Sequence, residues 1–223
     1  MQNKVWFITG AISDIGKATA IGLANMGANV VIIGRNEKQG ENAQNEIKSK
    51  NGNPKVDLLI ADLSSQVEIR KLAGEIQARY SALNGLINNA GIAPIKRSVT
   101  ADGIERVFAV NYLAPFLLTN LLLERLKARS PARVVNVAGD FHRKATIQFD
   151  DLMSERDYNF FFASPEKGAE TSIYLSSSPE VENVSGMYFI KKTQVASSPE
   201  SSDEEIPHRL WKVSVELTSL VKS

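Results

Sequence analysis

Short apolar runs alternate with helix-like periodicity along the first 140 residues of the chain. The runs are bounded by glycine and polar residues, as in strands buried on both faces of a parallel sheet; they cover 5–9, 29–34, 56–61, 86–89 and 133–138. Between them, cap residues and apolar spacing predict helices over 14–26, 36–52, from 65 onward and 102–129. This alternation predicts an α/β fold, a doubly wound parallel sheet covered by helices on both faces.

The pattern changes after residue 140. Residues 141–162 show no clear period, and Ser164-Pro165-Glu166 then predicts the start of a helix to about residue 176. Residues 186–191 predict a sixth strand. A capping box at 202–205 precedes a stripe at helical spacing, which predicts a docking helix; the stripe is Ile206, Leu210, Val213, Leu217 and Leu220.

One domain accounts for the whole chain, residues 1–223, because no repeat or linker divides it. We expect a regular core over 4–140, an irregular junction over 141–163, and a helix, an edge strand and a C-terminal helix over 164–223. A crossover helix from 164 would place the sixth strand beside the fifth, in the order 3-2-1-4-5-6.

Composition excludes several classes of function. Lys plus Arg is 26 and Asp plus Glu is 25, so the net charge is +1, which argues against a nucleic-acid partner held by bulk charge. The chain has no cysteine, which excludes disulfide scaffolds, cysteine-ligated zinc and thiol catalysis. Only His142 and His208 are present, so we expect no metal site.

No membrane or export segment is predicted. The apolar stretch after Met1 is too short for a secretory signal. Residues 107–126 are apolar but contain Asn111, Pro115 and Glu124, so a buried helix is expected rather than a span. A cytoplasmic location follows as the default expectation.

The turn over residues 9–16 joins the first strand to the first helix and carries Gly10 and Gly16. Backbone amides at such a turn, together with the helix dipole, favour a phosphate group. A P-loop nucleoside triphosphatase (NTPase) is the rival interpretation, because Gly16-Lys17 resembles the end of a Walker motif. That motif requires glycine at position 11 and serine or threonine at 18, and both are alanine here.

Arg35 follows the second strand by one residue. In a dinucleotide-binding fold this strand end meets the adenosine ribose, where an arginine suits a 2′-phosphate. Arg35 therefore favours NADP(H) over NAD(H). The alternative is a surface arginine at a helix start.

Several strings now coincide, and the chain resembles the short-chain dehydrogenase/reductase family over residues 4–140 and more weakly from 164. The strings are Thr9-Gly10 with Gly16, Ala61-Asp62-Leu63, Asn88-Asn89-Ala90-Gly91, Phe108-Ala109-Val110-Asn111 and Arg133-Val134-Val135-Asn136-Val137. Within the family, Gly34-Arg35-Asn36, the helix from Asn111 to Leu123, and Arg209-Leu210-Trp211 resemble the retinol-dehydrogenase-like branch.

The resemblance implies a Rossmann-type domain and an NADP(H)-linked oxidoreductase acting on a small-molecule alcohol or carbonyl substrate. By the same resemblance, Asn111 is the helix asparagine that positions a water in the proton relay. The implied cofactor residues are Gly10, Ser13, Ile15 and Gly16 at the pyrophosphate and nearby ribose, Arg35 at the 2′-phosphate, Asp62 and Leu63 at the adenine, and Asn89, Ala90 and Gly91 at the nicotinamide ribose.

Three departures from the family pattern bear on activity. Asp14 stands where the family has its second glycine; it either repels the pyrophosphate or points outward and caps the helix. Ala138-Gly139 stand where the family has Ser-Ser at the end of the fifth strand. No Tyr-x-x-x-Lys helix follows that strand, and the chain passes from Tyr158 to Ser164 as if a block were missing.

The Tyr-Lys pair matters because the lysine lowers the tyrosine pKa from about 10 and makes it a usable acid-base group. Tyr188 and Lys192 match the spacing, but we expect a strand there, which would hold the two side chains roughly 13 Å apart. Tyr112 is expected in the core. The candidates to substitute are Asp140, His142, Lys144 and Tyr158.

Three functions therefore stay open: an impaired oxidoreductase, a non-catalytic NADP(H)-binding sensor or partner protein, and a shortened, non-functional product of a longer enzyme. In the third case the 102–129 helix would lose a neighbour and expose apolar surface, which would favour a homo-oligomer or aggregation.

Overall fold

The computed structural model describes residues 1–52, 55–81, 83–128, 131–139, 146–156, 158 and 168–220. Its main sheet has five parallel strands in the order β3-β2-β1-β4-β5. The strands are β1 (Val5–Thr9), β2 (Asn29–Gly34), β3 (Val56–Ile60), β4 (Gly85–Asn88) and β5 (Arg133–Asn136). The predicted α/β fold class is confirmed.

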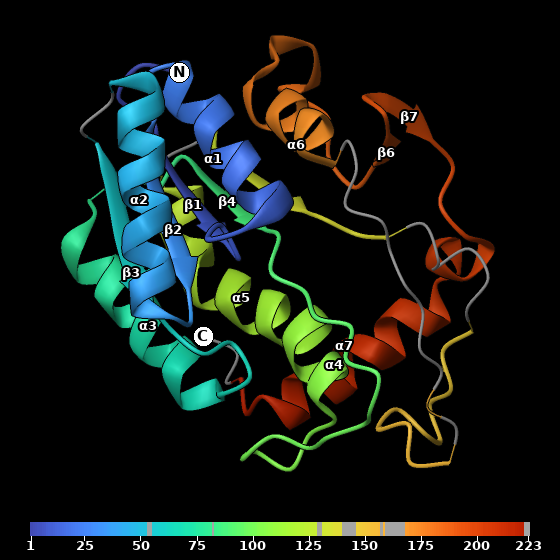
Figure 1. Cartoon of the computed structure of the whole chain (residues 1–223). Helices are drawn as coiled ribbons and strands as arrows, with labels where there is room; N and C mark the ends of the chain where they lie inside the picture. The colour runs from blue at the N-terminus through green and yellow to red at the C-terminus, as the bar shows by residue number, and fades with distance from the viewer. Residues whose placement is uncertain are drawn as a thin grey trace.

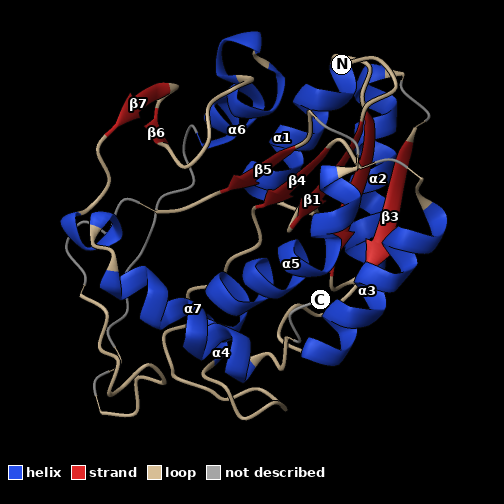
Figure 2. Ribbon diagram, turned by 180° about the vertical axis from the view of Figure 1, so that it is seen from behind, coloured by secondary structure: helices blue, strands red, loops and turns tan. Residues whose placement is uncertain are grey.

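Helices cover both faces of this sheet (Figures 1 and 2). One layer holds α1 (Asp14–Asn25), α2 (Glu37–Asn51) and α6 (Gly168–Ser177), and the other holds α3 (Gln66–Arg79) and α5 (Ala114–Lys127). Successive β1 side chains point to opposite layers, so Trp6 belongs to one buried cluster and Phe7 to the other. The central strands β2, β1 and β4 are therefore buried on both faces, as their continuous apolar runs predict, whereas the edge strands β3 and β5 are partly exposed.

The predicted 102–129 helix begins later than expected, at Arg106. It consists of α4 (Arg106–Phe108), a π-helical turn η1 (Ala109–Leu113) and α5. The Glu105 carboxylate fixes its start by accepting hydrogen bonds from the backbone N–H groups of Val107 and Phe108, at 2.9 and 2.7 Å.

Among the described residues, Arg106–Lys127 is the one helix long and apolar enough to cross a membrane. It packs on α3, β4 and β5, and its Leu117 and Leu122 are fully buried in the protein. This packing matches the expected core helix.

The prediction of a sixth strand in the main sheet is wrong. β6 (Tyr188–Ile190) pairs with β7 (Thr193–Val195) in a separate antiparallel hairpin, and Figure 2 shows this hairpin well apart from β5. The crossover begins as predicted, because Ile173 of α6 packs on Gly22 of α1. The chain then leaves the sheet, and the short strand β6 pairs with β7, which follows after a two-residue turn. The order 3-2-1-4-5-6 and the edge strand within 164–223 are thereby corrected.

The C-terminal helix α7 (Glu205–Leu217) docks at its C-terminal end, where Leu217 and Leu220 of the predicted stripe pack against buried clusters. Leu217 packs against the cluster that contains Ile104 and Leu113. The Asp203 carboxylate accepts hydrogen bonds from the N–H groups of Glu205 and Ile206 at the start of α7, at 2.8 and 3.0 Å. The side chain of Ser202, on which the predicted capping box depends, lies outside the part of the chain that the structure describes.

Candidate functional site

Two glycines allow the turn after β1 to touch the loop after β4. Gly10 has a φ of +65°, and a Cβ there would lie 2.8 Å from the Ala90 Cα atom. A Cβ on Gly16 would lie 2.5 Å from the Asn89 side-chain nitrogen. The Thr9 hydroxyl accepts hydrogen bonds from the N–H groups of Asn89 and Ala90, both at 3.0 Å. Hydrogen bonds and close packing thus fix the two loops to each other.

Beside these loops, at the carboxyl ends of the strands, lies a cavity of about 390 Å³. It sits where strand order reverses between β1 and β4, the position at which doubly wound sheets bind ligands. The structure brings all ten predicted cofactor residues to its wall: Gly10, Ser13, Ile15, Gly16, Arg35, Asp62, Leu63, Asn89, Ala90 and Gly91.

The wall also contains residues to which the sequence analysis gave no role in the site: Ile12, Gly34, Gln39, Ala61, Ile92, Arg106, Val110 and Val137. Arg106 and Val110 are one helical turn apart, so they share a face of the helix. This spacing shows that the two residues share a face, but it does not show which face of the helix meets the cavity. Of the residues in this helix, the sequence analysis gave only Asn111 a role in the site.

Asp62 is one of two acidic residues on the cavity wall, the other being Asp14. Its carboxylate accepts a hydrogen bond from the Ser64 N–H at 2.9 Å. Burial alone would raise the pKa of Asp62, but this hydrogen bonding and the positive charges of Arg106 and Arg35 hold the pKa below its ordinary value. Asp62 is therefore a carboxylate at neutral pH.

Asp14 lies on the cavity wall with an exposed side chain and a φ of +48°. It is the first residue of α1, after the N-cap Ser13, whose side chain makes no capping hydrogen bond. Within the described part of the chain, no capping hydrogen bond is made by Asp14 either. The geometry therefore places its charge at the glycine turn and gives no support to the capping alternative.

Lys17 does not face the cavity. Its ammonium group pairs with the Glu46 carboxylate of α2 at 2.7 Å. Hydrogen bonds from Lys17 and Lys50 lower the pKa of Glu46 to about 2. A Walker lysine would instead contact nucleotide phosphates, so the rival P-loop interpretation finds no support in the position of this side chain.

Asn111 lies in the π-helical turn and binds the loop after β4. Its Oδ1 accepts a hydrogen bond from the Ile92 N–H at 2.8 Å, and its Nδ2 donates to the Ile92 carbonyl at 2.9 Å. A Cβ on the neighbouring Gly91 would lie 3.6 Å from Oδ1. Asn111 therefore holds the cavity loop in place, and its predicted part in a proton relay stays a prediction.

Tyr158 is a tether rather than a group of the cavity wall. Its hydroxyl donates to the Pro94 carbonyl at 2.7 Å, and burial, with the Glu105 charge, raises its pKa. The other three candidate substitutes, Asp140, His142 and Lys144, lie outside the described residues, as does the predicted helix start at Ser164.

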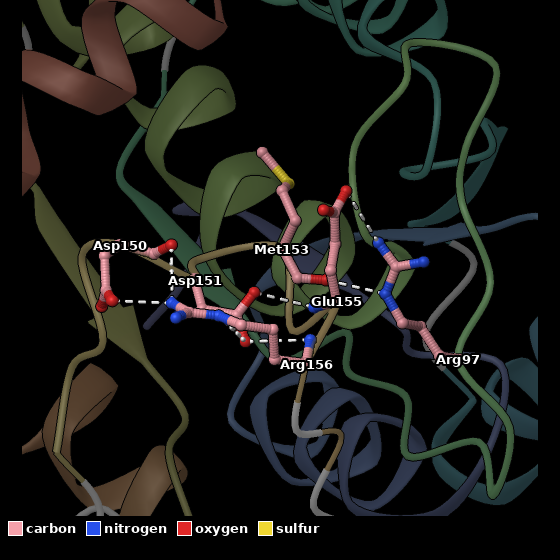
Figure 3. A network of polar contacts seen from close by, with 6 residues as sticks. All are labelled: Arg97, Asp150, Asp151, Met153, Glu155 and Arg156. Carbon is pink, nitrogen blue, oxygen red and sulfur yellow. Dashed lines mark hydrogen bonds and ion pairs between the residues drawn. The ribbon is translucent and has the colours of Figure 1, made fainter.

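A polar network holds residues 146–156 beside the same loop (Figure 3). The Arg97 Nε atom donates to the Met153 carbonyl at 2.8 Å, and its guanidinium lies 3.8 Å from the Glu155 carboxylate. Arg156 pairs with Asp150 at 2.6 Å. The Arg97 contacts hold this segment against the loop that follows β4, and the Arg156–Asp150 pair lies within the segment itself.

Tyr188 lies in β6, as the predicted strand requires, whereas Lys192 lies in the turn between β6 and β7, with a φ of 66°. The Lys192 ammonium pairs with Glu170 at 3.0 Å. Neither residue lines the cavity. Tyr112 packs in the core, and its hydroxyl interacts with the Ser214 hydroxyl at 3.1 Å. The described residues contain no cluster suited to a metal ion.

Comparisons with known proteins agree with this geometry. The family model for short chain dehydrogenase matches residues 4–149. Retinol dehydrogenase 13 of Mus musculus is 32% identical over 284 residues, which cover 99% of this chain and 85% of the relative. Retinol dehydrogenase 12 of Homo sapiens is 35% identical over 277 residues, with 99% and 88% covered.

The first of these alignments is longer than the chain. It spans 284 residues of the relative against 223 in this protein, so at least 61 positions have no counterpart here.

Solved structures show the same fold. A protein from Mycobacterium paratuberculosis superposes with a TM-score of 0.72 at 23% identity and covers 98% of this chain and 94% of its own. A short chain dehydrogenase from Escherichia coli CFT073, complexed with NADPH, has a TM-score of 0.57 at 25% identity, with 69% and 66% covered.

Proposed function

The chain belongs to the short chain dehydrogenase family, and from this premise we propose that it binds NADP(H) across the cavity. We further propose that it is an oxidoreductase for alcohol or carbonyl substrates whose turnover is impaired. The single observation that carries the proposal is the convergence of all ten predicted cofactor residues on one cavity at the switch point of the sheet.

The residues present fit a dinucleotide. The first turn of α1 faces the cavity, and the side chain of its N-cap Ser13 makes no capping bond, so backbone N–H groups are available for a pyrophosphate. Asn89, Ala90 and Gly91 would hold the nicotinamide half, because their loop is bonded to Thr9 and to Asn111. When bound, the nicotinamide ring supplies or accepts the hydride.

Preference for NADP(H) is supported by Arg35, an exposed guanidinium on the cavity wall directly after β2. An arginine at this strand end suits a 2′-phosphate, whereas an acidic residue would suit a free ribose hydroxyl. Relatives of known structure include complexes with NADP and NADPH.

Impairment is supported by two observations. Ala138 and Gly139 follow β5 and carry no side-chain donor. At least 61 positions of an aligned retinol dehydrogenase have no counterpart in the chain, enough to contain a catalytic helix and a strand. General acid-base groups contribute about 10²- to 10⁴-fold, so we expect turnover slower than that of an intact relative by about this factor.

The first experiment is a thermal-melt titration of the 223-residue chain with NADPH and, separately, NADH. A ligand at 100 times its Kd adds about 2.7 kcal/mol of stability, which corresponds to several degrees in Tm. We expect NADPH to raise Tm more than NADH, and Arg35→Met to remove the difference. A cooperative melt that neither cofactor shifts at about millimolar concentration would contradict the proposal.

A second measurement addresses chemistry. Single-turnover oxidation of NADPH with all-trans-retinal, the aldehyde that corresponds to the relatives' printed substrate, separates a slow enzyme from a binding protein. Slow but enzyme-dependent oxidation supports an impaired oxidoreductase. Cofactor binding without any oxidation would leave the sensor or partner protein as the function.

A further inference from the structure

Arg106 approaches the cavity from the helix layer opposite Arg35. Arg35 directly precedes α2, which belongs to the layer of α1 and α6, whereas Arg106 opens the helix that continues into α5, next to α3 (Figures 1 and 2). Both line the same cavity. The two arginines therefore belong to different elements and reach the same cavity.

The Arg106 side chain is half-buried and is available to a ligand. Its neighbour Glu105 is 3% exposed, and the Glu105 carboxylate caps the helix by accepting backbone hydrogen bonds. This carboxylate therefore does not pair with the Arg106 guanidinium. Within the described part of the chain, no hydrogen bond or ion pair engages the Arg106 guanidinium.

The surroundings of Arg106 suit an aromatic base better than a phosphate. Val110 follows one helical turn later on the same face and also lines the cavity, as does Leu63. Asp62, on which both arginines act, presents a carboxylate that can accept hydrogen bonds from the amino group of a base. An apolar wall with one planar cation and one acceptor matches adenine.

We propose that Arg106 stacks its guanidinium on the adenine ring of the bound dinucleotide. The inference rests on the proposed function and adds a division of labour to it. Arg35 distinguishes NADPH from NADH, whereas Arg106 strengthens both equally, because the adenine is common to them. Stacked cation–π contacts at partly exposed sites correspond to about a 3- to 10-fold gain in affinity.

The test uses fragments of the cofactor, measured by calorimetry on the full chain. The ligands are 2′,5′-ADP, 5′-AMP and nicotinamide mononucleotide, which has a 5′-phosphate but no adenine. The variants are Arg106→Met, which keeps the aliphatic stem, Arg35→Met, and Lys71→Met as a control that removes a positive charge from the exposed face of α3, away from the cavity wall.

We expect Arg106→Met to weaken 2′,5′-ADP and 5′-AMP by the same factor, about 3- to 10-fold, and to leave nicotinamide mononucleotide unchanged. Arg35→Met should weaken 2′,5′-ADP alone, and Lys71→Met should change none of the three. A larger loss for 2′,5′-ADP than for 5′-AMP in Arg106→Met would assign the residue to the phosphate and overturn the inference. No loss, or an equal loss for all three ligands, would overturn it as well.

Failure of the proposed function gives a different result. In that case the unmodified chain would bind neither NADPH nor 2′,5′-ADP, so there would be no affinity with which to compare the variants. If the unmodified chain binds NADPH and Arg106→Met binds it equally well, only the stacking role is contradicted.

Discussion

At residue 14 the chain carries a carboxylate in a backbone conformation that favours glycine. The φ of Asp14 is +48°, and its side chain lies on the cavity wall beside the turn that would hold the pyrophosphate. Asp14 therefore has two unfavourable effects, one on the stability of the protein and one on cofactor binding. The backbone cost, about 1 kcal/mol, lowers stability, and the charge repels a bound dinucleotide.

Two substitutions at this position separate the costs. We expect Asp14→Asn to raise NADPH affinity about tenfold with little change in stability, because asparagine tolerates the left-handed region as aspartate does. Asp14→Gly should raise affinity similarly and also stabilise the free protein by about 1 kcal/mol. Calorimetric titration and urea unfolding measure the two effects. Unchanged affinity in both variants would show that the carboxylate points away from the ligand.

Asn111 is expected to act on the nicotinamide half through the loop that it holds. Asn111→Ala removes both hydrogen bonds to Ile92, at about 0.5–1.5 kcal/mol each, and should weaken nicotinamide mononucleotide more than 5′-AMP. Calorimetry with the two fragments measures the difference. Asn120→Ala is the matched control, because among the described residues its side chain donates to the Phe116 carbonyl of its own helix and to no cavity loop. Equal loss for both fragments would mean that the substitution perturbs the whole cavity.

At the scale of elements, the β6–β7 hairpin turns through two lysines in the left-handed region, with φ values of 49° at Lys191 and 66° at Lys192. A two-residue turn of this kind strongly favours Asn-Gly. We expect Lys191→Asn with Lys192→Gly to stabilise the hairpin by about 1 kcal/mol, seen as slower amide exchange over β6 and β7. Changing both lysines to alanine removes the same charges but keeps a side chain at both left-handed positions. An equal gain in hairpin stability in this alanine variant would show that the effect comes from the lost charges.

The elements differ in how far sequence alone could predict them. β1 and β2 were predictable to the residue, because buried parallel strands form continuous apolar runs that end in glycine or polar residues. The start of the α4–α5 helix was not, because its cap is Glu105, a residue type rarely expected in that role. β6 was predicted as a strand but assigned the wrong partner. A three-residue segment has no apolar pattern that distinguishes a sheet edge from a hairpin.

The candidate site shows the same limit. Glycines and short motifs identified ten wall residues, because their roles depend on the backbone at the strand ends. Arg106 and Val110 were missed because their contribution depends on how the helix is rotated about its axis. That rotation is set by packing against α3 and the sheet, which no local pattern records.

At the scale of the whole molecule, long-range contacts connect the last helix to the first half of the chain. The Gln66 side chain donates to the Leu217 carbonyl at 2.9 Å, and the Arg70 guanidinium donates to the Thr218 carbonyl at 2.6 Å. Trp211 of α7 packs edge-on against Phe116 of α5, with ring centroids 5.0 Å apart. These contacts join α7 to α3 and α5, so we expect α7 to unfold together with the sheet.

The two tryptophans of the chain test this cooperativity, because Trp6 is 1% exposed in β1 and Trp211 is 44% exposed on α7. In Trp211→Phe the remaining tryptophan fluorescence comes from Trp6 and reports the sheet alone. The difference between this fluorescence and that of the unmodified protein reports α7. We expect both signals and the far-ultraviolet circular dichroism to give one urea midpoint, since a single domain unfolds in one transition. Arg70→Met should lower that common midpoint without splitting it. If Trp211 responds first and Trp6 later, α7 is a separately melting arm, and the chain cannot be treated as one domain from residue 1 to 223.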